Sequence, residues 1–441
     1  MGLWFSGTER LRWVILLACI LVSSPAQSES WRDISIAGLQ AADEGRLEEA
    51  EKLFRKAFEA SNEFDQGDPR HATSISNLAY ILHAKGDYED AEASYRQALA
   101  MREATLGRDH PDVAESYNNL GELYRRLGRY DEAHDFHQQA LEIRRKAQGE
   151  RHPDTAQSMN NLAVLHAHQK LFDQAEELYQ EALKIRIRSF GKDHLSTAET
   201  QNNLAALYFA QGLYSKAEPL YEHAVEVEER MFGSQHPSLG TTLSNLAELY
   251  RVQGKLDQAI RLHQRALEIR TATLGSEHPD TAQSLNNLAV AQFENRNEEV
   301  AEQLYRKSLE IKEVVFGEDH SELALTLNNL AELLRAQKRF DEAEPLYRRA
   351  LDIEEANFGP NHPNLALGLN NLALLHFDNG AYLEAEKLLD RALSIEERSL
   401  GENHPSLIVT LENYAIVLRE LRRHKDAETV EVRAKNLRAQ L

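Results

Sequence analysis

The chain has 441 residues, of which 42% are hydrophobic and 27% are charged, a composition typical of a folded globular protein. Its formal net charge is −21 at pH 7. Such an acidic chain offers no excess of positive charge to a nucleic-acid backbone, and an anionic membrane surface would repel it, so nucleic acid is not expected as a partner. Cysteine occurs once, which rules out an intrachain disulfide.

The first 26 residues differ from the rest of the chain. Arg10 and Arg12 precede an apolar run at 13–22, and small residues follow up to Ala26. A basic flank, about ten apolar residues and a small-residue end are typical of a secretory signal peptide, and the run is shorter than the roughly 20 apolar residues that span a bilayer. We therefore expect residues 1–26 to be removed and the chain to be exported, either to a periplasm or out of the cell.

A second interpretation of this segment involves its cysteine. The sequence LLAC, which ends at Cys19, resembles the lipobox of bacterial lipoproteins, in which the cysteine becomes a lipidated N-terminus. The apolar run continues past Cys19, where such sequences usually turn polar, so cleavage after Ala26 is favoured. A lipid anchor at Cys19, which would hold the chain at a membrane, stays the alternative.

From residue 72 onward the sequence repeats with a period of 42 residues. A ladder of asparagines recurs at Asn77, Asn119, Asn161, Asn203, Asn245, Asn287, Asn329, Asn371 and Asn413. A histidine recurs with the same period at His110, His152, His194, His236, His278, His320, His362 and His404. A fixed period of this length predicts a stack of identical units. Such a stack forms an extended surface, which favours a binding function over a catalytic one.

Each unit is predicted to contain two antiparallel helices. In residues 113–149, apolar side chains recur at helical spacing on both sides of Gly128, which marks the turn. Pairs such as Asp173 with Glu176 are interpreted as capping boxes at the start of the second helix, and a glycine such as Gly191 is expected to end it in a left-handed cap. The turn at Arg296 lacks the usual glycine, so we expect it to be irregular.

These features resemble the tetratricopeptide repeat in its 42-residue version, similar to that of kinesin light chains. The resemblance rests on strings such as NNLGELYRRLGRYDEA at 118–133 and on joints such as 275–282, and it covers about residues 72–440. It implies an all-α fold, a right-handed α-solenoid of about ten antiparallel helix pairs. Residues 27–71 would form N-terminal capping helices or a partial repeat, and residues 72–441 the tandem array with a C-terminal cap. No long heptad segment precedes the repeats, so the motor role of kinesin light chains is not carried over.

The repeating histidines do not predict a metal site. Neighbouring units stack roughly 10 Å apart, whereas zinc ligands lie about 2 Å from the metal, so equivalent histidines cannot share an ion. We expect each histidine to cap or pack at the joint between units. The sequence also lacks an HExxH motif, a phosphate-binding loop and a Gly-x-Ser-x-Gly elbow, so no catalytic residue, metal or cofactor is predicted.

The asparagine ladder is the first candidate for function. Asparagine is a mediocre helix former, yet it lies in mid-helix nine times, so another interaction must offset its cost. The resemblance implies that this position faces the concave groove, where an amide can bond the backbone of an extended peptide. Alternatively, each asparagine bonds the adjacent repeat and is purely structural. The two interpretations carry about equal weight, and both can hold.

A second pattern accompanies the ladder from Asn203 onward. The residues six places after each asparagine alternate between phenylalanine and arginine: Phe209, Arg251, Phe293, Arg335, Phe377 and Arg419. The residues three places after it are Ala206, Glu248, Val290, Glu332, Leu374 and Ile416. Each Glu–Arg pair could be an intrahelical ion pair and each Phe ordinary packing. The alternation instead favours a ligand-facing stripe that selects extended segments with apolar and acidic clusters.

The function predicted from the sequence is therefore a non-catalytic scaffold that binds extended segments of other proteins in the groove of an exported solenoid. The main alternative is a structural assembly or tethering subunit that acts through its ends or its convex face. A regulatory partner of an enzyme on another chain is a third, weaker hypothesis.

Overall fold

The structure, a computed structural model, describes residues 25–43, 46–65, 67–363 and 365–439. These residues form twenty α-helices and no strand, which confirms the all-α prediction. None of the described helices is both long and apolar enough to cross a membrane. The expected signal peptide, with Arg10, Arg12 and Cys19, lies outside the described residues except for its last two positions, which begin the first helix.

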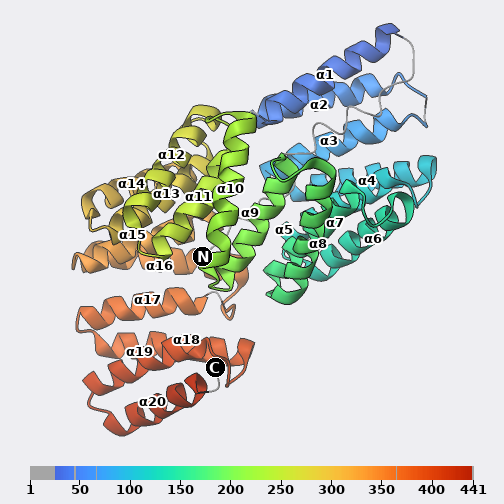
Figure 1. The fold of residues 1–441 in the computed structure, drawn as a ribbon. Coiled ribbons are helices and arrows are strands. Elements are labelled where there is room, and N and C mark those ends of the chain that lie inside the picture. The colour runs from blue at the N-terminus through green and yellow to red at the C-terminus, as the bar shows by residue number, and fades with distance from the viewer. Residues whose placement is uncertain (1–24, 44–45, 66, 364, 440–441) are drawn as a thin grey trace. The chain divides into compact units, whose positions relative to one another are not determined.

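The helices pair as the 42-residue period predicts. In the repeat at residues 113–149, α5 (Pro111–Arg126) packs against α6 (Tyr130–Gln148), and a turn at Gly128 joins them. The chain divides into two compact units, residues 1–275 and 276–441, and each is described by itself. Within each unit every pair packs against the next pair along the chain (Figure 1).

The first unit contains six helix pairs. Besides α5 and α6 they comprise α1 (Pro25–Asp43), α2 (Leu47–Ser61), α3 (Pro69–Lys85), α4 (Tyr88–Leu106), α7 (Pro153–His168), α8 (Phe172–Phe190), α9 (Leu195–Ala210), α10 (Tyr214–Phe232), α11 (Pro237–Val252) and α12 (Leu256–Leu274).

The second unit contains four helix pairs, one of which begins with a 3₁₀ turn. They comprise α13 (Pro279–Glu294), α14 (Glu298–Phe316), η2 (Ser321–Leu323), α15 (Ala324–Ala336), α16 (Phe340–Phe358), α17 (Leu365–Asp378), α18 (Tyr382–Leu400), α19 (Leu407–Glu420) and α20 (His424–Arg438).

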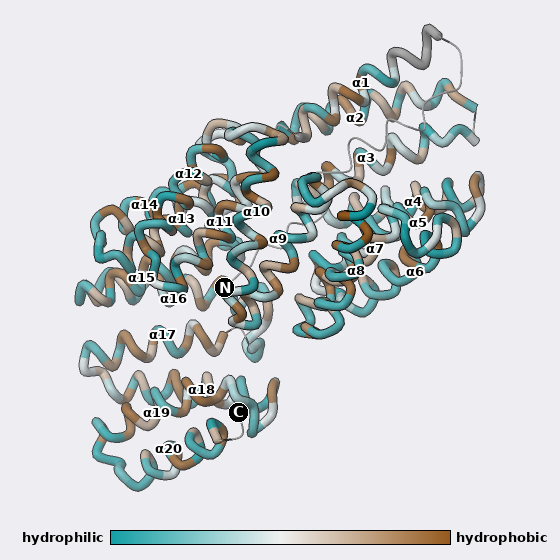
Figure 2. The backbone as a smooth tube through the Cα atoms, in the orientation of Figure 1, coloured by the Kyte–Doolittle hydropathy of each residue, from teal (hydrophilic) through white to brown (hydrophobic). Residues whose placement is uncertain are grey.

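Small side chains let the helices of a pair approach closely. Ala205 on α9 and Ala217 on α10 are both fully buried, and the equivalent alanines of the other repeats are buried as well. Larger side chains, such as Tyr221 on α10, fill the space between successive pairs and are also fully buried. Hydrophobic residues therefore recur along the helices of both units instead of gathering in one element (Figure 2).

The turns within pairs are more uniform than the sequence predicts. Gly254 has φ 75°, and Arg296, at the equivalent place between α13 and α14, has φ 62°. The expected irregular turn at Arg296 is therefore wrong, because the arginine adopts the left-handed conformation that glycine adopts elsewhere. Lys170, Lys338 and Arg422 do the same, with φ between 60° and 61°.

The predicted caps of the second helices are also wrong. Helix α8 begins at Phe172, and its N-cap residue is Leu171, which makes no side-chain cap bond. Asp173 lies two residues past the N-cap position, too far inside the helix to cap it. At the other end, Gly191 has φ 91° and ψ 167°. This is an extended conformation at positive φ, which is essentially restricted to glycine and is distinct from a left-handed helical cap.

Candidate functional site

Seven of the eight repeating histidines accept a backbone hydrogen bond at the joint that leads into the first helix of a pair. His110 precedes α5, and its Nδ1 accepts a hydrogen bond from the backbone N–H of Asp112 at 3.1 Å. The same bond is made by His152, His194, His236, His278, His320 and His404. These bonds confirm the expected role at the joints. Among the described residues no group of three histidine, cysteine, aspartate or glutamate side chains could hold a metal ion.

The asparagine ladder bonds neighbouring repeats. In the first unit, Nδ2 of Asn245 donates to Oδ1 of Asn202 at 3.2 Å. In the second unit, Nδ2 of Asn329 donates to Oδ1 of Asn286 at 3.1 Å. Equivalent bonds over 43 residues join Asn119 to Ser76, Asn203 to Asn160 and Asn413 to Asn370. The structural interpretation is therefore confirmed at these five of the nine ladder positions, and the role of the ladder in ligand binding stays a prediction.

Exposure along the ladder differs between the two units. In the first unit Asn119 is half-buried, and the other four ladder asparagines are at most 5% exposed: Asn77, Asn161, Asn203 and Asn245. In the second unit all four ladder residues are half-buried: Asn287, Asn329, Asn371 and Asn413. A bound peptide could therefore reach the amides of the second unit more readily than most of those in the first.

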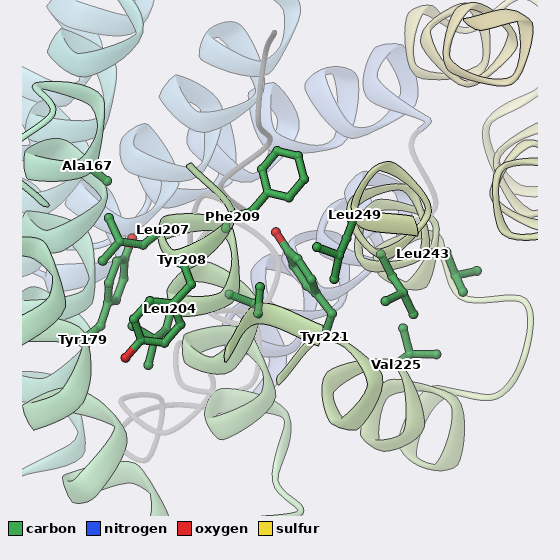
Figure 3. Close-up of a cluster of buried hydrophobic side chains, with 14 of the residues drawn as sticks. Ala167, Tyr179, Leu204, Leu207, Tyr208, Phe209, Tyr221, Val225, Leu243 and Leu249 are labelled. Carbon is green, nitrogen blue, oxygen red and sulfur yellow. The ribbon is translucent and has the colours of Figure 1, made fainter. Parts of the chain in front are cut away.

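The phenylalanines of the alternating stripe pack mainly into the helix stack. Phe209 is 7% exposed and belongs to a buried cluster with Leu207 and Tyr221 (Figure 3). Phe293 and Phe377 are half-buried and pack against the buried clusters of the second unit. Packing thus accounts for much of the apolar part of the stripe.

The arginines of the stripe form ion pairs. Arg251 lies 2.6 Å from Glu248, and Arg335 lies 2.7 Å from Glu332, each across one turn of its own helix. Arg335 also pairs with Asp378, and its hydrogen bond to Glu332 raises the pKa of the guanidinium. Arg419 pairs with Glu431 of α20 at 2.7 Å. Nearby carboxylates therefore offset the positive charge that was expected to select acidic ligands.

The second helices carry a column of charged residues that sequence reasoning missed. It comprises Arg102, Arg144, Arg186, Glu228, Arg270, Lys312, Glu354 and Glu396, one every 42 residues. Most members bond the first helix of the next pair: Nη1 of Arg102, for example, donates to Oγ of Ser116 at 2.8 Å. In the second unit, Nζ of Lys312 donates to Oγ1 of Thr326 at 3.1 Å. A hydroxyl lies 14 residues downstream of every member of the column except Glu354, and this spacing is the sequence signal that could have revealed the contact.

The second unit also contains a cavity of about 320 Å³ between α15 and α17. The ladder residues Asn329 and Asn371 line it together with Leu325 and Leu367, whose side chains are 48% and 69% exposed. Glu354 of α16 lines the cavity as well. The cavity thus combines amides that can bond a peptide backbone with apolar surface that is open to solvent.

Comparison with known proteins agrees with this architecture. The family model of the tetratricopeptide repeat matches the chain at residues 35–104, 70–146, 135–186, 154–230, 238–313, 322–377 and 364–440. The chain belongs to the tetratricopeptide repeat family. The resemblance inferred from the asparagine-containing strings is thereby confirmed, and the fold of this tetratricopeptide repeat protein is that of a protein–protein interaction scaffold.

Several solved structures are similar to parts of the chain. BtubC (BKLC) from P. vanneervenii is 28% identical, with 57% of this chain and 94% of that chain covered at a TM-score of 0.41. The nearly identical repeats of a putative kinesin light chain from Podosopora anserina are also 28% identical, with coverages of 47% and 98% and a TM-score of 0.40. The apo form of RapI is 15% identical, with coverages of 64% and 97% and a TM-score of 0.50. A search among curated proteins found no match.

Proposed function

We propose that this tetratricopeptide repeat protein is an exported, non-catalytic scaffold that binds extended segments of other proteins along its first helices. The cavity of the second unit carries this proposal, because Asn329 and Asn371 border it beside the exposed side chains of Leu325 and Leu367. An amide both donates and accepts hydrogen bonds, so successive ladder residues can hold a peptide backbone whatever its side chains are.

The ladder can serve the stack and a ligand together. Asn329 uses its Nδ2 to bond the preceding repeat. Its amide oxygen can accept a further hydrogen bond from a peptide N–H, because a carbonyl oxygen has two lone pairs. Buried amides such as Asn203, which is 0% exposed, serve the stack alone.

The test is capture of partners by the purified mature chain from its own cellular compartment. We expect the double substitution Asn329→Ala and Asn371→Ala to reduce the amount of captured protein at least fivefold while circular dichroism keeps its helical amplitude. The matched control is Asn203→Ala and Asn245→Ala, which lie at the same repeat position but are buried, and which should lower thermal stability more than capture. If capture survives Asn329→Ala and Asn371→Ala but is lost when the end helices α1 or α20 are altered, assembly through the ends replaces groove binding.

Export rests on the sequence of residues 1–26 and has its own test. N-terminal sequencing of the protein from cells should begin at Gln27, because cleavage is expected after Ala26. A lipidated start at Cys19 would indicate the tethered alternative, and an intact Met1 would contradict both.

A further inference from the structure

We propose that the cavity between α15 and α17 is a subsite for a lysine or arginine side chain of the bound segment, whose neighbouring apolar side chains lie on Leu325 and Leu367. This inference rests on the proposed function and names the chemistry that one part of the groove selects. Three observations support it, and the first two come from positions where the last repeats depart from the earlier ones.

The first observation is a column of exposed apolar residues. The position four residues before the ladder asparagine is polar in six successive copies: Thr73, Glu115, Gln157, Glu199, Thr241 and Gln283. In the last three copies it becomes Leu325, Leu367 and Val409, which are 48%, 69% and 63% exposed. These side chains add little to the packing of the stack. An apolar row that is open to water in three consecutive repeats is typical of a binding surface.

The second observation concerns Glu354, the member of the buried charged column that belongs to this cavity. The residue that should face it from α17 is Gly368, whereas the equivalent residues in neighbouring repeats are Thr326 and Thr410. A Cβ atom at Gly368 would lie 3.4 Å from Oε2 of Glu354 and 2.8 Å from Cδ2 of Leu351, so a hydroxyl side chain at this position would reach the carboxylate once Leu351 shifted. Oε2 of Glu354 is buried and accepts no hydrogen bond, and burial raises the pKa of this carboxyl.

A comparison within the column shows why this glutamate differs. Oε2 of Glu228 and Oε2 of Glu396 are also buried without a hydrogen bond. Glu228, however, accepts a bond from Thr242 at 3.0 Å, and Glu396 is hydrogen-bonded by Thr410. Only Glu354 faces a glycine, and of the three glutamates it is the one that lines the cavity.

The third observation is the balance of charge and hydrogen-bond acceptors. Oδ1 of Asn328, also in the cavity lining, is buried and accepts no hydrogen bond. Arg335 lies on the same helix, but Glu332 and Asp378 both pair with it. The acidic groups therefore outnumber the basic ones, and the unsatisfied atoms are acceptors. A ligand that fits must donate hydrogen bonds and carry positive charge, as an ammonium or guanidinium group does.

The spacing of the leucines suggests the form of the ligand. Leu325 and Leu367 lie one repeat apart, which is roughly 10 Å for packed helices. A polyproline II segment has three residues per turn and rises about 3.1 Å per residue, so side chains three residues apart lie on one face about 9 Å from each other. Two apolar residues three positions apart, with a basic residue between them, would match the two leucines and the cavity.

The test uses three fluorescein-labelled nonapeptides with a leucine at every third position. The residue after each leucine is lysine in the first peptide, glutamate in the second and serine in the third. Binding to the full mature chain is measured by fluorescence polarisation. We expect the lysine peptide to bind at least tenfold more tightly than the glutamate peptide, since one charge-assisted bond is lost and a repulsion is added.

Four variants locate the effect. Glu354→Gln and Gly368→Ser should each weaken binding of the lysine peptide about tenfold and change binding of the serine peptide by no more than about twofold. The matched control is Glu396→Gln, which changes the equivalent residue of the next repeat and should leave all three peptides unchanged. Leu367→Thr places a polar residue at this position, as in the earlier repeats, and should weaken binding of all three peptides.

The outcomes separate this inference from the proposed function. If the lysine and glutamate peptides bind equally, or if Glu354→Gln and Glu396→Gln act alike, the cationic subsite is wrong while groove binding stands. If none of the peptides binds, the subsite is also wrong. Groove binding itself fails only if Asn329→Ala and Asn371→Ala leave partner capture unchanged.

Discussion

The ion pair between Arg186 and Glu199 offers a sharp test of how successive repeats are held together. Arg186 of α8 is 2% exposed, and its Nη1 donates to the backbone oxygen of Ser196 at 2.5 Å and to Oγ1 of Thr200 at 2.6 Å. Glu199 of α9 is 6% exposed and lies 3.3 Å from the same nitrogen. Burial lowers the pKa of Arg186, and the negative charge of Glu199 counters that effect.

The expected magnitudes follow from this geometry. Glu199→Gln leaves a buried guanidinium without its counter-charge, and Arg186→Met leaves a buried carboxylate without its own, so each should lower the free energy of unfolding by about 3–5 kcal/mol. The double variant Arg186→Met with Glu199→Leu removes both charges. It should cost at least about 2 kcal/mol less than either single change, because no unpaired charge then remains buried.

The assay combines urea unfolding, followed by circular dichroism, with hydrogen exchange of the amides in α8 and α9. Exchange is needed because a stack of repeats opens locally as well as globally. The control is Glu177→Gln, an exposed glutamate of α8, which should change stability by less than about 0.5 kcal/mol. A cost below about 1 kcal/mol for Glu199→Gln would refute the idea that this carboxylate compensates the buried charge.

Three further predictions concern stability. Burial lowers the pKa of His263 to about 3. At a pH between about 3 and 6.5, His263 therefore stays neutral in the folded chain but binds a proton in the unfolded chain. The stability that His263 confers is thus complete above about pH 6.5 and falls by about 1.4 kcal/mol per unit as the pH drops from there toward 3. His263→Tyr, which introduces the residue found at this place in five other repeats, should flatten that dependence in urea midpoints measured from pH 7 to 4. Arg296→Gly should raise stability by about 0.5–1 kcal/mol in urea unfolding, since φ is 62° there, whereas Gly254→Ala at the equivalent turn should lower it. His278→Ala should cost about 1 kcal/mol by the same assay, and His278→Asn should cost less, because asparagine can replace the cap that His278 supplies.

The fold could be predicted from the sequence because every repeat shows the same helical spacing of apolar residues. Residues 113–149 show helical periodicity on both sides of Gly128, and α5 ends and α6 begins within two residues of that glycine. The joint histidines could also be assigned, since their spacing excluded a shared metal and left capping as the simpler role. In both cases local rules and the 42-residue period point to one answer.

The features that escaped prediction depend on contacts between repeats. Asp173 matches the capping-box pattern, but α8 begins one residue before it, at Phe172. Asp173 therefore lies within the first turn, and no side chain caps the start of this helix. Arg335 appears on the helix surface as a free cation until Asp378, 43 residues later in the next repeat, is placed beside it. The burial of Arg186 likewise depends on how the next pair of helices packs. Such contacts cannot be read from one repeat, although a charged residue and a hydroxyl that recur 14 residues apart would have indicated them.

The two departures in α17 are best explained by recognition. A stack alone requires that each buried charge in a second helix meet a partner in the next first helix, as Lys312 meets Thr326. At Gly368 this partner is absent, and the neighbouring residue Leu367 exposes 69% of an apolar side chain where earlier repeats carry a polar one. Both changes cost stability or solubility in the free chain. Glu354, which Gly368 leaves without a hydroxyl partner, and Leu367 line the same cavity. The side chain of Leu351 fills the space beside Gly368, but it supplies no hydrogen-bond donor to Glu354 and leaves Leu367 exposed. A ligand that supplies a donor to Glu354 and covers Leu367 would offset both costs at once.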